Sequence, residues 1–166
     1  MRLPALLSTT LALAAFAPAQ TASFTTYGTG CGAPGNPPPL IQALTLPQIG
    51  AAFTVRFVAL PSGQTPVSVD WPAMIMGLQQ AQTPVPVLSP SQPANCNFLL
   101  STDVILFMPW NGTSYQNTFT MQIPNDPGLI GVSFHQQWAE LYSRCQPTCQ
   151  PLMIRVTNAA TATVGL

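Results

Sequence analysis

The side chains that could carry out acid–base or nucleophilic chemistry are few and lie far apart in this chain. His135 is the only histidine, and no Gly-x-Ser-x-Gly motif accompanies it, so the usual signature of a Ser-His-Asp hydrolase is missing. His135 falls on the more polar side of its strand, which predicts an exposed or hydrogen-bonded imidazole. A glycosidase needs two carboxylates a few ångströms apart, whereas the acidic residues here are scattered: Asp70, Asp103, Asp126 and Glu140.

The sequence also predicts no metal ion and no cofactor. Asn125 and Asp126 could supply some of the oxygen ligands that calcium requires, but a turn explains Asp126 better, and Asp103 likewise. The Gly/Pro-rich loop 28–39 lacks the lysine and the following helix of a phosphate-binding loop. We therefore expect no catalytic residue, and the protein is predicted not to be an enzyme.

Aromatic side chains are the remaining candidates for ligand binding. Rings that face solvent can stack on sugars through apolar contact. Trp110 and Tyr115 flank a turn, so they are the predicted surface pair, whereas Trp138 and Tyr142 are expected in the core. Trp71 and Tyr27 complete the set, and most of these rings are expected to be buried.

The four cysteines are typical of an oxidising compartment and allow three disulfide pairings. Cys145 and Cys149 are close enough in sequence to close a local loop. Cys31 and Cys96 would then form a long-range bridge, which contributes on the order of 4 kcal/mol in the chain-entropy model. A zinc site is the less favoured alternative, because the CxxC spacings of zinc ribbons are absent.

Charged residues are very sparse. The chain contains no lysine, and its formal net charge is +0. Beyond the N-terminal segment only Arg56, Arg144 and Arg155 are basic, so neither a nucleic-acid groove nor an anionic-lipid surface is expected. A neutral polar surface gives little repulsion between copies and tolerates self-association, although sequence drift explains it at least as well.

The first 19 residues read as a signal peptide. Arg2 precedes an apolar stretch over 3–16 that is too short to span a bilayer, and Ala17-Pro18-Ala19 fits a small-x-small cleavage site. The mature chain, 20–166, is expected to be one domain that is exported and not inserted into a membrane.

Residues 118–142 form the stretch around which the other elements are expected to gather. Apolar residues alternate with polar ones over 118–123, and again from Ile130 to Phe134, which predicts two strands around a Pro/Gly-rich turn. They are expected to form an antiparallel hairpin or a corner between two sheets. For 135–142 the pattern favours a strand, with a helix as the alternative.

The rest of the mature chain is predicted to consist mainly of short strands with turn residues between them. Residues 73–78 are apolar on both faces, which predicts a central strand covered on both sides or a strand with one flank resting on a neighbour. Residues 79–94 are expected to be a long loop with a short edge strand at 85–87. The other expected strands are 21–27, 40–46, 52–60, 96–100, 104–108, 153–156 and 159–164. The predicted fold is an all-β antiparallel sandwich, Ig-like or jelly-roll-like, stapled by disulfides.

Several stretches resemble a recurrent secreted β-rich domain of unknown function found in exported proteins of planctomycete-type bacteria. They are YGTGCG at 27–32, LPQIG at 46–50, CNFLLSTDV at 96–104, IPNDPGLIGVSF at 123–134 and the ending 156–165. The resemblance covers most of the mature chain, and the block at 123–134 is its most specific part. It implies a small β-rich domain and supports the pairing of Cys31 with Cys96. It transfers no activity and no site residue.

The sequence thus predicts a secreted, non-catalytic module with a structural or interaction role, such as adhesion. Its expected partners are other extracellular proteins or surface polysaccharide. A carbohydrate-binding module that uses Trp110 and Tyr115 is the second hypothesis, and a hydrolase is a distant third. An exposed apolar edge strand would favour the first hypothesis, through strand addition between copies.

Overall fold

A computed structural model of the chain describes residues 20–32, 35, 37–58, 67–90, 92–93, 95–109, 116–145 and 153–166, with the backbone alone for 67–70, 116 and 142–145. The predicted signal peptide, 1–19, lies outside the described residues. Within them the structure is all-β, with one short 3₁₀ turn, η1 (Pro127–Leu129), and no α-helix. None of the described residues forms a helix that could cross a membrane.

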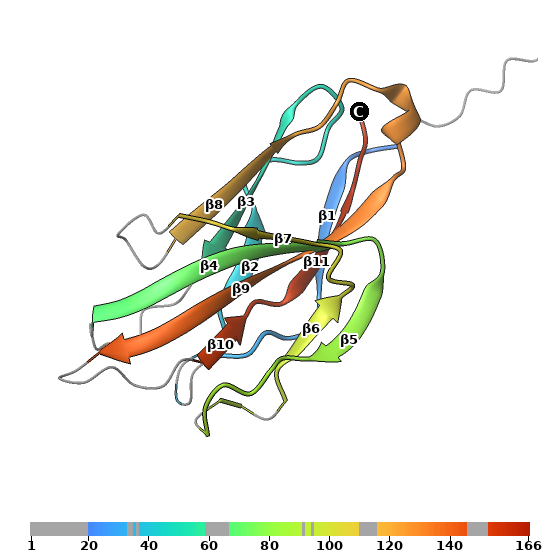
Figure 1. Cartoon of the computed structure of the whole chain (residues 1–166). Helices are drawn as coiled ribbons and strands as arrows, with labels where there is room; N and C mark the ends of the chain where they lie inside the picture. The colour runs from blue at the N-terminus through green and yellow to red at the C-terminus, as the bar shows by residue number, and fades with distance from the viewer. Residues whose placement is uncertain are drawn as a thin grey trace, which may run out of the picture.

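The largest sheet has six strands and is built around two long neighbours, β4 (Val67–Gly77) and β9 (Ser133–Cys145). Figure 1 shows them side by side through the centre of the molecule. β7 (Val104–Phe107) pairs with the far side of β4. On the other side of β9 lie β11 (Ala159–Thr163), followed by β1 (Ser23–Tyr27), and, further along β9, β10 (Met153–Val156).

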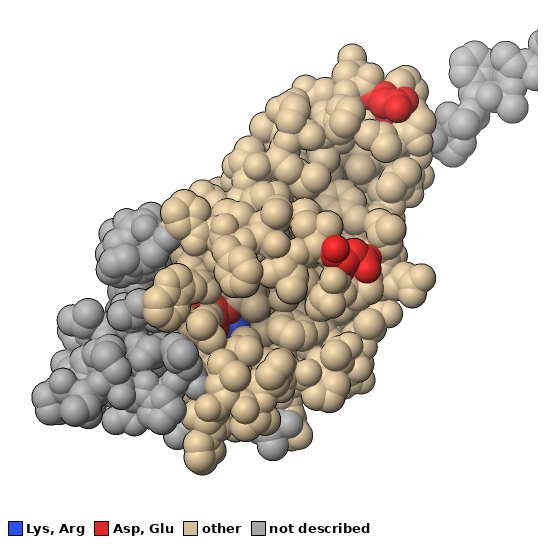
Figure 2. All heavy atoms as spheres, in the orientation of Figure 1, with Lys and Arg blue, Asp and Glu red and all other residues tan. Residues whose placement is uncertain are grey.

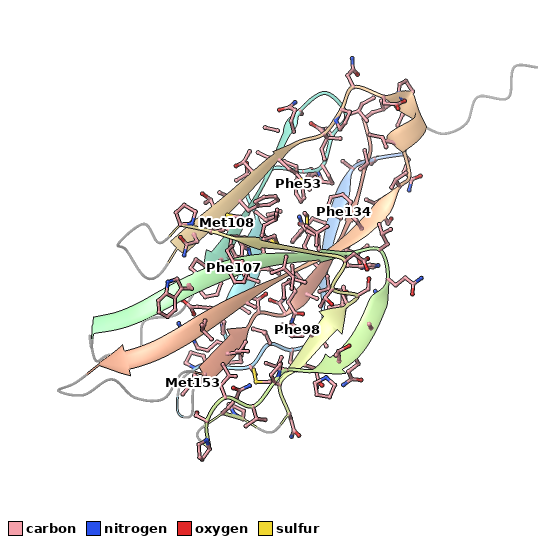
Figure 3. All side chains as sticks on the ribbon, viewed as in Figure 1. Phe53, Phe98, Phe107, Met108, Phe134 and Met153 are labelled. Carbon is pink, nitrogen blue, oxygen red and sulfur yellow. A yellow bond between two sulfur atoms is a disulfide. The ribbon has the colours of Figure 1, made fainter. Side chains whose placement is uncertain are left out.

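A second sheet covers one face of the first. It contains β2 (Leu40–Ala43), β3 (Ala52–Val58) and β8 (Gln116–Gln122), all antiparallel. Phe53, Val55 and Phe57 alternate along β3 and are fully buried, as the period of two predicts. Phe53 meets Phe134 of β9 with ring centroids 6.1 Å apart (Figure 3), so aromatic packing joins the two sheets.

A pair of short strands, β5 (Gln80–Pro84) and β6 (Asn97–Leu100), covers part of the opposite face of the six-stranded sheet, which we call the outer face. Met74 of β4 packs in the core between the two larger sheets, and its neighbour Ile75 packs toward β6 with Leu100. The prediction of a central strand covered on both sides is therefore confirmed around Met74 and Ile75, whereas Trp71, earlier in β4, is 46% exposed.

The turn after β8 is a corner between sheets, and the hairpin alternative is wrong. β8 belongs to the three-stranded sheet, whereas β9 belongs to the six-stranded sheet. Asp126 accepts a hydrogen bond from the Gly128 N–H at 2.8 Å and caps η1. The second strand begins at Ser133 and not at 130 as predicted, because Gly131 takes a φ of +86° that a strand does not use.

Residues 135–142 are extended, as the sequence favoured, because β9 pairs with β4 and β10 over this range. The edge strand predicted at 85–87 is wrong. Pairing with β6 occurs at 80–84 instead, and it ends near Pro86, which has no N–H to donate. β5 reads Gln-Ala-Gln-Thr-Pro, so no apolar alternation marks it as a strand.

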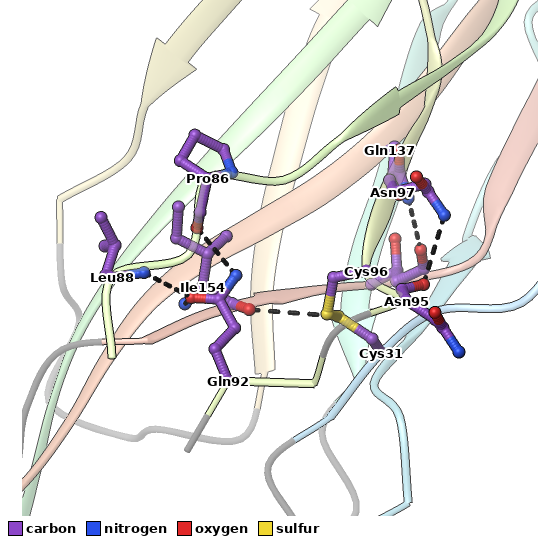
Figure 4. Close-up of a disulfide and its surroundings, with 10 residues drawn as sticks. Cys31, Pro86, Leu88, Gln92, Asn95, Cys96, Asn97, Gln137 and Ile154 are labelled. Carbon is purple, nitrogen blue, oxygen red and sulfur yellow. Dashed lines mark hydrogen bonds between the residues drawn. A yellow bond between two sulfur atoms is a disulfide. The ribbon is translucent and has the colours of Figure 1, made fainter. Parts of the chain in front are cut away.

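The Cys31–Cys96 disulfide is present, with the two Cα atoms 5.5 Å apart. It joins the segment after β1, where Cys31 pairs with Val156, to the start of β6 (Figure 4). Nearby, the buried Gln92 accepts from Leu88 N–H and Ile154 N–H and donates to the Pro86 carbonyl. The disulfide therefore fastens the β5–β6 pair to the larger sheet. Cys149 and the side chain of Cys145 lie outside the described residues.

Candidate interaction surface

The outer face of the six-stranded sheet holds a groove of about 250 Å³ where the β5–β6 pair does not cover it. Its floor comes from alternate residues of the two long strands, because side chains two apart in a strand point to the same face. These residues are Trp71, Ala73 and Ile75 of β4 and Ala139 and Leu141 of β9.

Four further apolar side chains border this floor. Phe98 projects from β6, Ile154 lies on β10, and Ile105 and Phe107 lie on β7 at the edge of the sheet. Figure 3 shows Phe98 and Phe107 on their separate strands. The groove thus crosses four neighbouring strands of one sheet, and every described residue that lines it is apolar or aromatic. We refer to it as the apolar groove.

The floor of the apolar groove is buried around Ile75, whereas its Trp71 end and its β7 side are exposed. Ile75 is only 2% exposed, whereas Trp71 is 46%, Ile105 49% and Phe107 77% exposed. A large exposed aromatic side chain beside a buried apolar floor gives a contiguous apolar patch, and such patches mark interaction sites in soluble proteins.

β7 forms the edge of the sheet beside this groove, because among the described residues it pairs only with β4. Met108, the residue after β7, donates its N–H to the Pro72 carbonyl at 2.8 Å. Main-chain groups alternate in direction along a strand, so those of Ile105 and Phe107 point away from β4. The edge thus presents main-chain donors and acceptors that have no partner among the described residues, together with apolar side chains.

Charged groups are sparse around the apolar groove. In Figure 2 the visible described surface is almost entirely uncharged, with isolated acidic patches and one recessed place where acidic and basic atoms lie together. Asp103, which precedes β7, is held in a turn, where it accepts hydrogen bonds from the Leu78 N–H and the Ser101 hydroxyl, each at 2.8 Å. These bonds stabilise the carboxylate and lower its pKa. Its prediction as a turn residue is confirmed.

His135 is hydrogen-bonded, as expected, but it is 9% exposed and so less accessible than the polar side of its strand suggests. Its Nδ1 lies 3.0 Å from the Thr161 hydroxyl, and its ring meets Tyr27 edge-on at 5.8 Å. Burial lowers its pKa and raises the pKa of Tyr27, whose hydroxyl donates to the Leu99 carbonyl at 3.1 Å. In the described part of the chain neither a serine nor a carboxylate bonds to His135.

The carboxylates with described side chains occupy different surroundings. Asp103 and Asp126 lie in exposed turns, whereas Glu140 is buried and paired with Arg155, whose Nε donates to it at 2.8 Å. The described residues contain no group of three or more histidine, cysteine, aspartate or glutamate side chains that could hold a metal ion. Asp70 has no described side chain.

The predicted sugar-binding pair, Trp110 and Tyr115, lies outside the described residues. Trp138 is fully buried, which confirms its predicted place in the core, and the side chain of Tyr142 is not described. The exposed indole within the described part is Trp71, which the sequence did not single out. The apolar run Val-Ile-Leu-Phe at 104–107, with no charge to protect an edge, is the signal that could have marked the surface.

Comparisons with protein-family models, with curated proteins and with solved structures gave no significant match for this chain.

Proposed function

We propose that this chain is an extracellular, non-catalytic interaction module that binds an extended segment of another protein at β7 and the apolar groove. The observation that carries the proposal is the apolar edge strand β7, which among the described residues pairs only with β4 and borders a groove whose described lining is apolar. An extended segment could add to β7 through main-chain hydrogen bonds while alternate side chains enter the groove. In strand addition, the main-chain hydrogen bonds usually supply the affinity and the side-chain pockets supply the specificity.

The size of the groove favours side chains over a whole small-molecule ligand. Its volume of about 250 Å³ is below the roughly 300–1,000 Å³ of typical ligand pockets. Such pockets also carry a few polar groups that orient the ligand, whereas the lining residues that the structure describes are all apolar or aromatic.

An extracellular location is supported by the Cys31–Cys96 disulfide, because such bonds persist in oxidising compartments. The predicted signal peptide and the resemblance to a recurrent secreted domain point the same way, and both remain predictions.

A carbohydrate-binding module is the second candidate, and Trp71 is the observation that favours it. Its indole is 46% exposed on a sheet face, where a sugar ring could stack. The apolar surroundings of Trp71 offer few partners for sugar hydroxyls, so we rank this candidate second. Trp110 and Tyr115 remain predicted ligand-binding residues at a separate turn.

The two candidates are distinguished by screening the oxidised mature protein against a peptide array and a glycan array. We expect binding to peptides with alternating apolar residues and at least tenfold weaker binding after Phe107→Ser. Val87→Ser is the matched control, because Val87 is 67% exposed and does not line the groove.

Absence of peptide binding by the folded protein, or binding that Phe107→Ser leaves unchanged, would refute the proposal. Glycan binding that is lost in Trp71→Ala would favour a carbohydrate module at the groove. Glycan binding that is lost in the Trp110→Ala/Tyr115→Ala double variant would place such a site at the predicted turn.

A further inference from the structure

We infer that the partner at β7 is a second copy of this chain, joined through antiparallel β7–β7 pairing about a two-fold axis. The inference rests on the proposed function, since it names one occupant for the same surface. Two six-stranded sheets would become one continuous sheet, and the two apolar grooves would lie side by side on the same face.

The main-chain geometry of β7 fits such pairing. Ile105 and Phe107 direct their N–H and C=O groups away from β4, so they can exchange hydrogen bonds with a strand on the other side. A two-fold axis perpendicular to the sheet also keeps both outer faces on the same side. Residues of the same parity then lie opposite each other.

The side chains select one register. With the axis at Leu106, Ile105 lies opposite Phe107 of the second copy, and Val104 lies opposite Met108, so that apolar residues face apolar residues. With the axis at Ile105, Asp103 would lie opposite Phe107 instead. That register is disfavoured because the Asp103 carboxylate is already engaged by Leu78 and Ser101.

Charge does not oppose this contact. No residue from 104 to 109 is charged, the chain contains no lysine, and its formal net charge is +0. Natural edge strands are commonly protected by charged side chains, by proline or by a covering segment. β7 contains no charged residue and no proline, and the nearest proline is Pro109, beyond the strand.

The exposed apolar area of β7 determines how stable the dimer is expected to be. Phe107 is 77% and Ile105 is 49% exposed. Because an aromatic side chain buries roughly 150–250 Å², the pair contributes on the order of 250 Å² per copy. Stable interfaces bury about 800 Å² per partner, so the dimer is expected to be weak and reversible. It would form at high local concentration, as in a dense extracellular layer.

Sedimentation equilibrium over a concentration series up to about millimolar tests the inference. We expect the average mass to rise toward that of a dimer and the rise to disappear in Ile105→Lys, which adds a like charge at each side of the axis. Thr25→Lys is the matched control, because Thr25 is exposed on β1 at the opposite edge of the same sheet. Circular dichroism checks that both variants fold.

Cross-linking tests the register. In this register Ile105 and Phe107 of the second copy exchange hydrogen bonds, so their Cα atoms would lie about 5.5 Å apart, within disulfide range. The Cα atoms of Ile105 in the two copies would lie on the order of 8 Å apart. Mild oxidation of a mixture of Ile105→Cys and Phe107→Cys should therefore give more linked dimer than either variant alone.

A protein that stays monomeric at millimolar concentration would overturn the second-copy inference, and so would a dimer that Ile105→Lys leaves intact. Peptide binding that Phe107→Ser abolishes would still support the interaction module in either case, so the two failures can be distinguished. Equal cross-linking by either single variant would overturn the register.

Discussion

Gln136 and Gln137 are neighbours on β9, both fully buried, yet their amides have opposite surroundings. Gln137 faces the β5–β6 pair, where its Oε1 accepts from the Leu99 N–H at 2.8 Å. Its Nε2 donates to the Thr157 carbonyl at 2.7 Å and, more weakly, to that of Asn97. Gln136 lies on the opposite face of β9, and neither atom of its amide has a hydrogen-bond partner among the described residues. Replacing each by methionine, a side chain of similar length, should therefore have opposite effects.

The magnitudes follow from which groups are left unpaired. Gln137→Met leaves the Leu99 N–H and the Thr157 carbonyl without their partner, at about 1–3 kcal/mol each, so we expect a loss of about 2–6 kcal/mol in the free energy of unfolding. Gln136→Met removes a buried amide that has no partner, and mutational data put the cost of such a group at about 1–3 kcal/mol. We therefore expect that variant to be about 1–2 kcal/mol more stable than the parent.

Urea unfolding, followed by tryptophan fluorescence and circular dichroism, measures both variants. With a slope near 2 kcal/mol per molar urea, the midpoint should fall by about 1–3 M for Gln137→Met and rise by about 0.5–1 M for Gln136→Met. Fully buried Trp138 lies beside both positions and reports the loss of the core. If Gln136→Met destabilised the protein as much as Gln137→Met does, the reasoning from hydrogen-bond partners would be refuted.

Three further outcomes are expected from urea or thermal unfolding. Cys31→Ala/Cys96→Ala should lower the unfolding free energy by about 4 kcal/mol, because the disulfide closes a loop between residues 65 positions apart in the sequence. A loss below about 1 kcal/mol would contradict the chain-entropy argument. Arg155→Met should cost about 3–5 kcal/mol, since it breaks a buried ion pair with the Glu140 carboxylate, and Arg155→Met/Glu140→Leu should recover most of the loss. Burial lowers the pKa of His135 below its usual 6.5, so the unfolded chain binds a proton there more readily than the folded protein does. The free energy of unfolding should therefore fall as the pH drops below about 6.5, and His135→Gln should remove this pH dependence.

Much of the sandwich follows from local pattern. Alternation along β3 predicts which side chains are buried, and Phe53, Val55 and Phe57 are all fully buried. The apolar run in β4 predicts a strand with both faces occupied. Cysteine spacing and the family resemblance both indicate Cys31–Cys96, which the structure contains.

The strand β5 and the apolar groove could not be predicted from the same signals. β5 is polar and exposed, and main-chain pairing with β6 makes it a strand without any apolar face. The apolar run at 104–107 predicts a strand, but a period of two does not say which strand pairs with which. That β7 lies at an edge is a property of the topology, and the groove depends on it.

The lengths of the strands account for the uncovered part of the outer face. At about 3.3 Å per residue, the 11 residues of β4 span roughly 36 Å, whereas the 4 residues of β6 span only about 13 Å. The cover is held at one end of the face by the disulfide and by Gln137, so β5 and β6 leave the other end uncovered.

Chance composition is a poor explanation for the apolar residues at that open end. The chain does place polar residues where a sheet face meets water, because Thr54, Thr118, Thr120 and Gln122 occupy the solvent side of the three-stranded sheet. In the six-stranded sheet the corresponding exposed positions at the edge are Ile105 and Phe107. A chain that uses threonine freely on one exposed face, yet keeps its edge strand entirely apolar on another, has a surface suited to being covered by a partner.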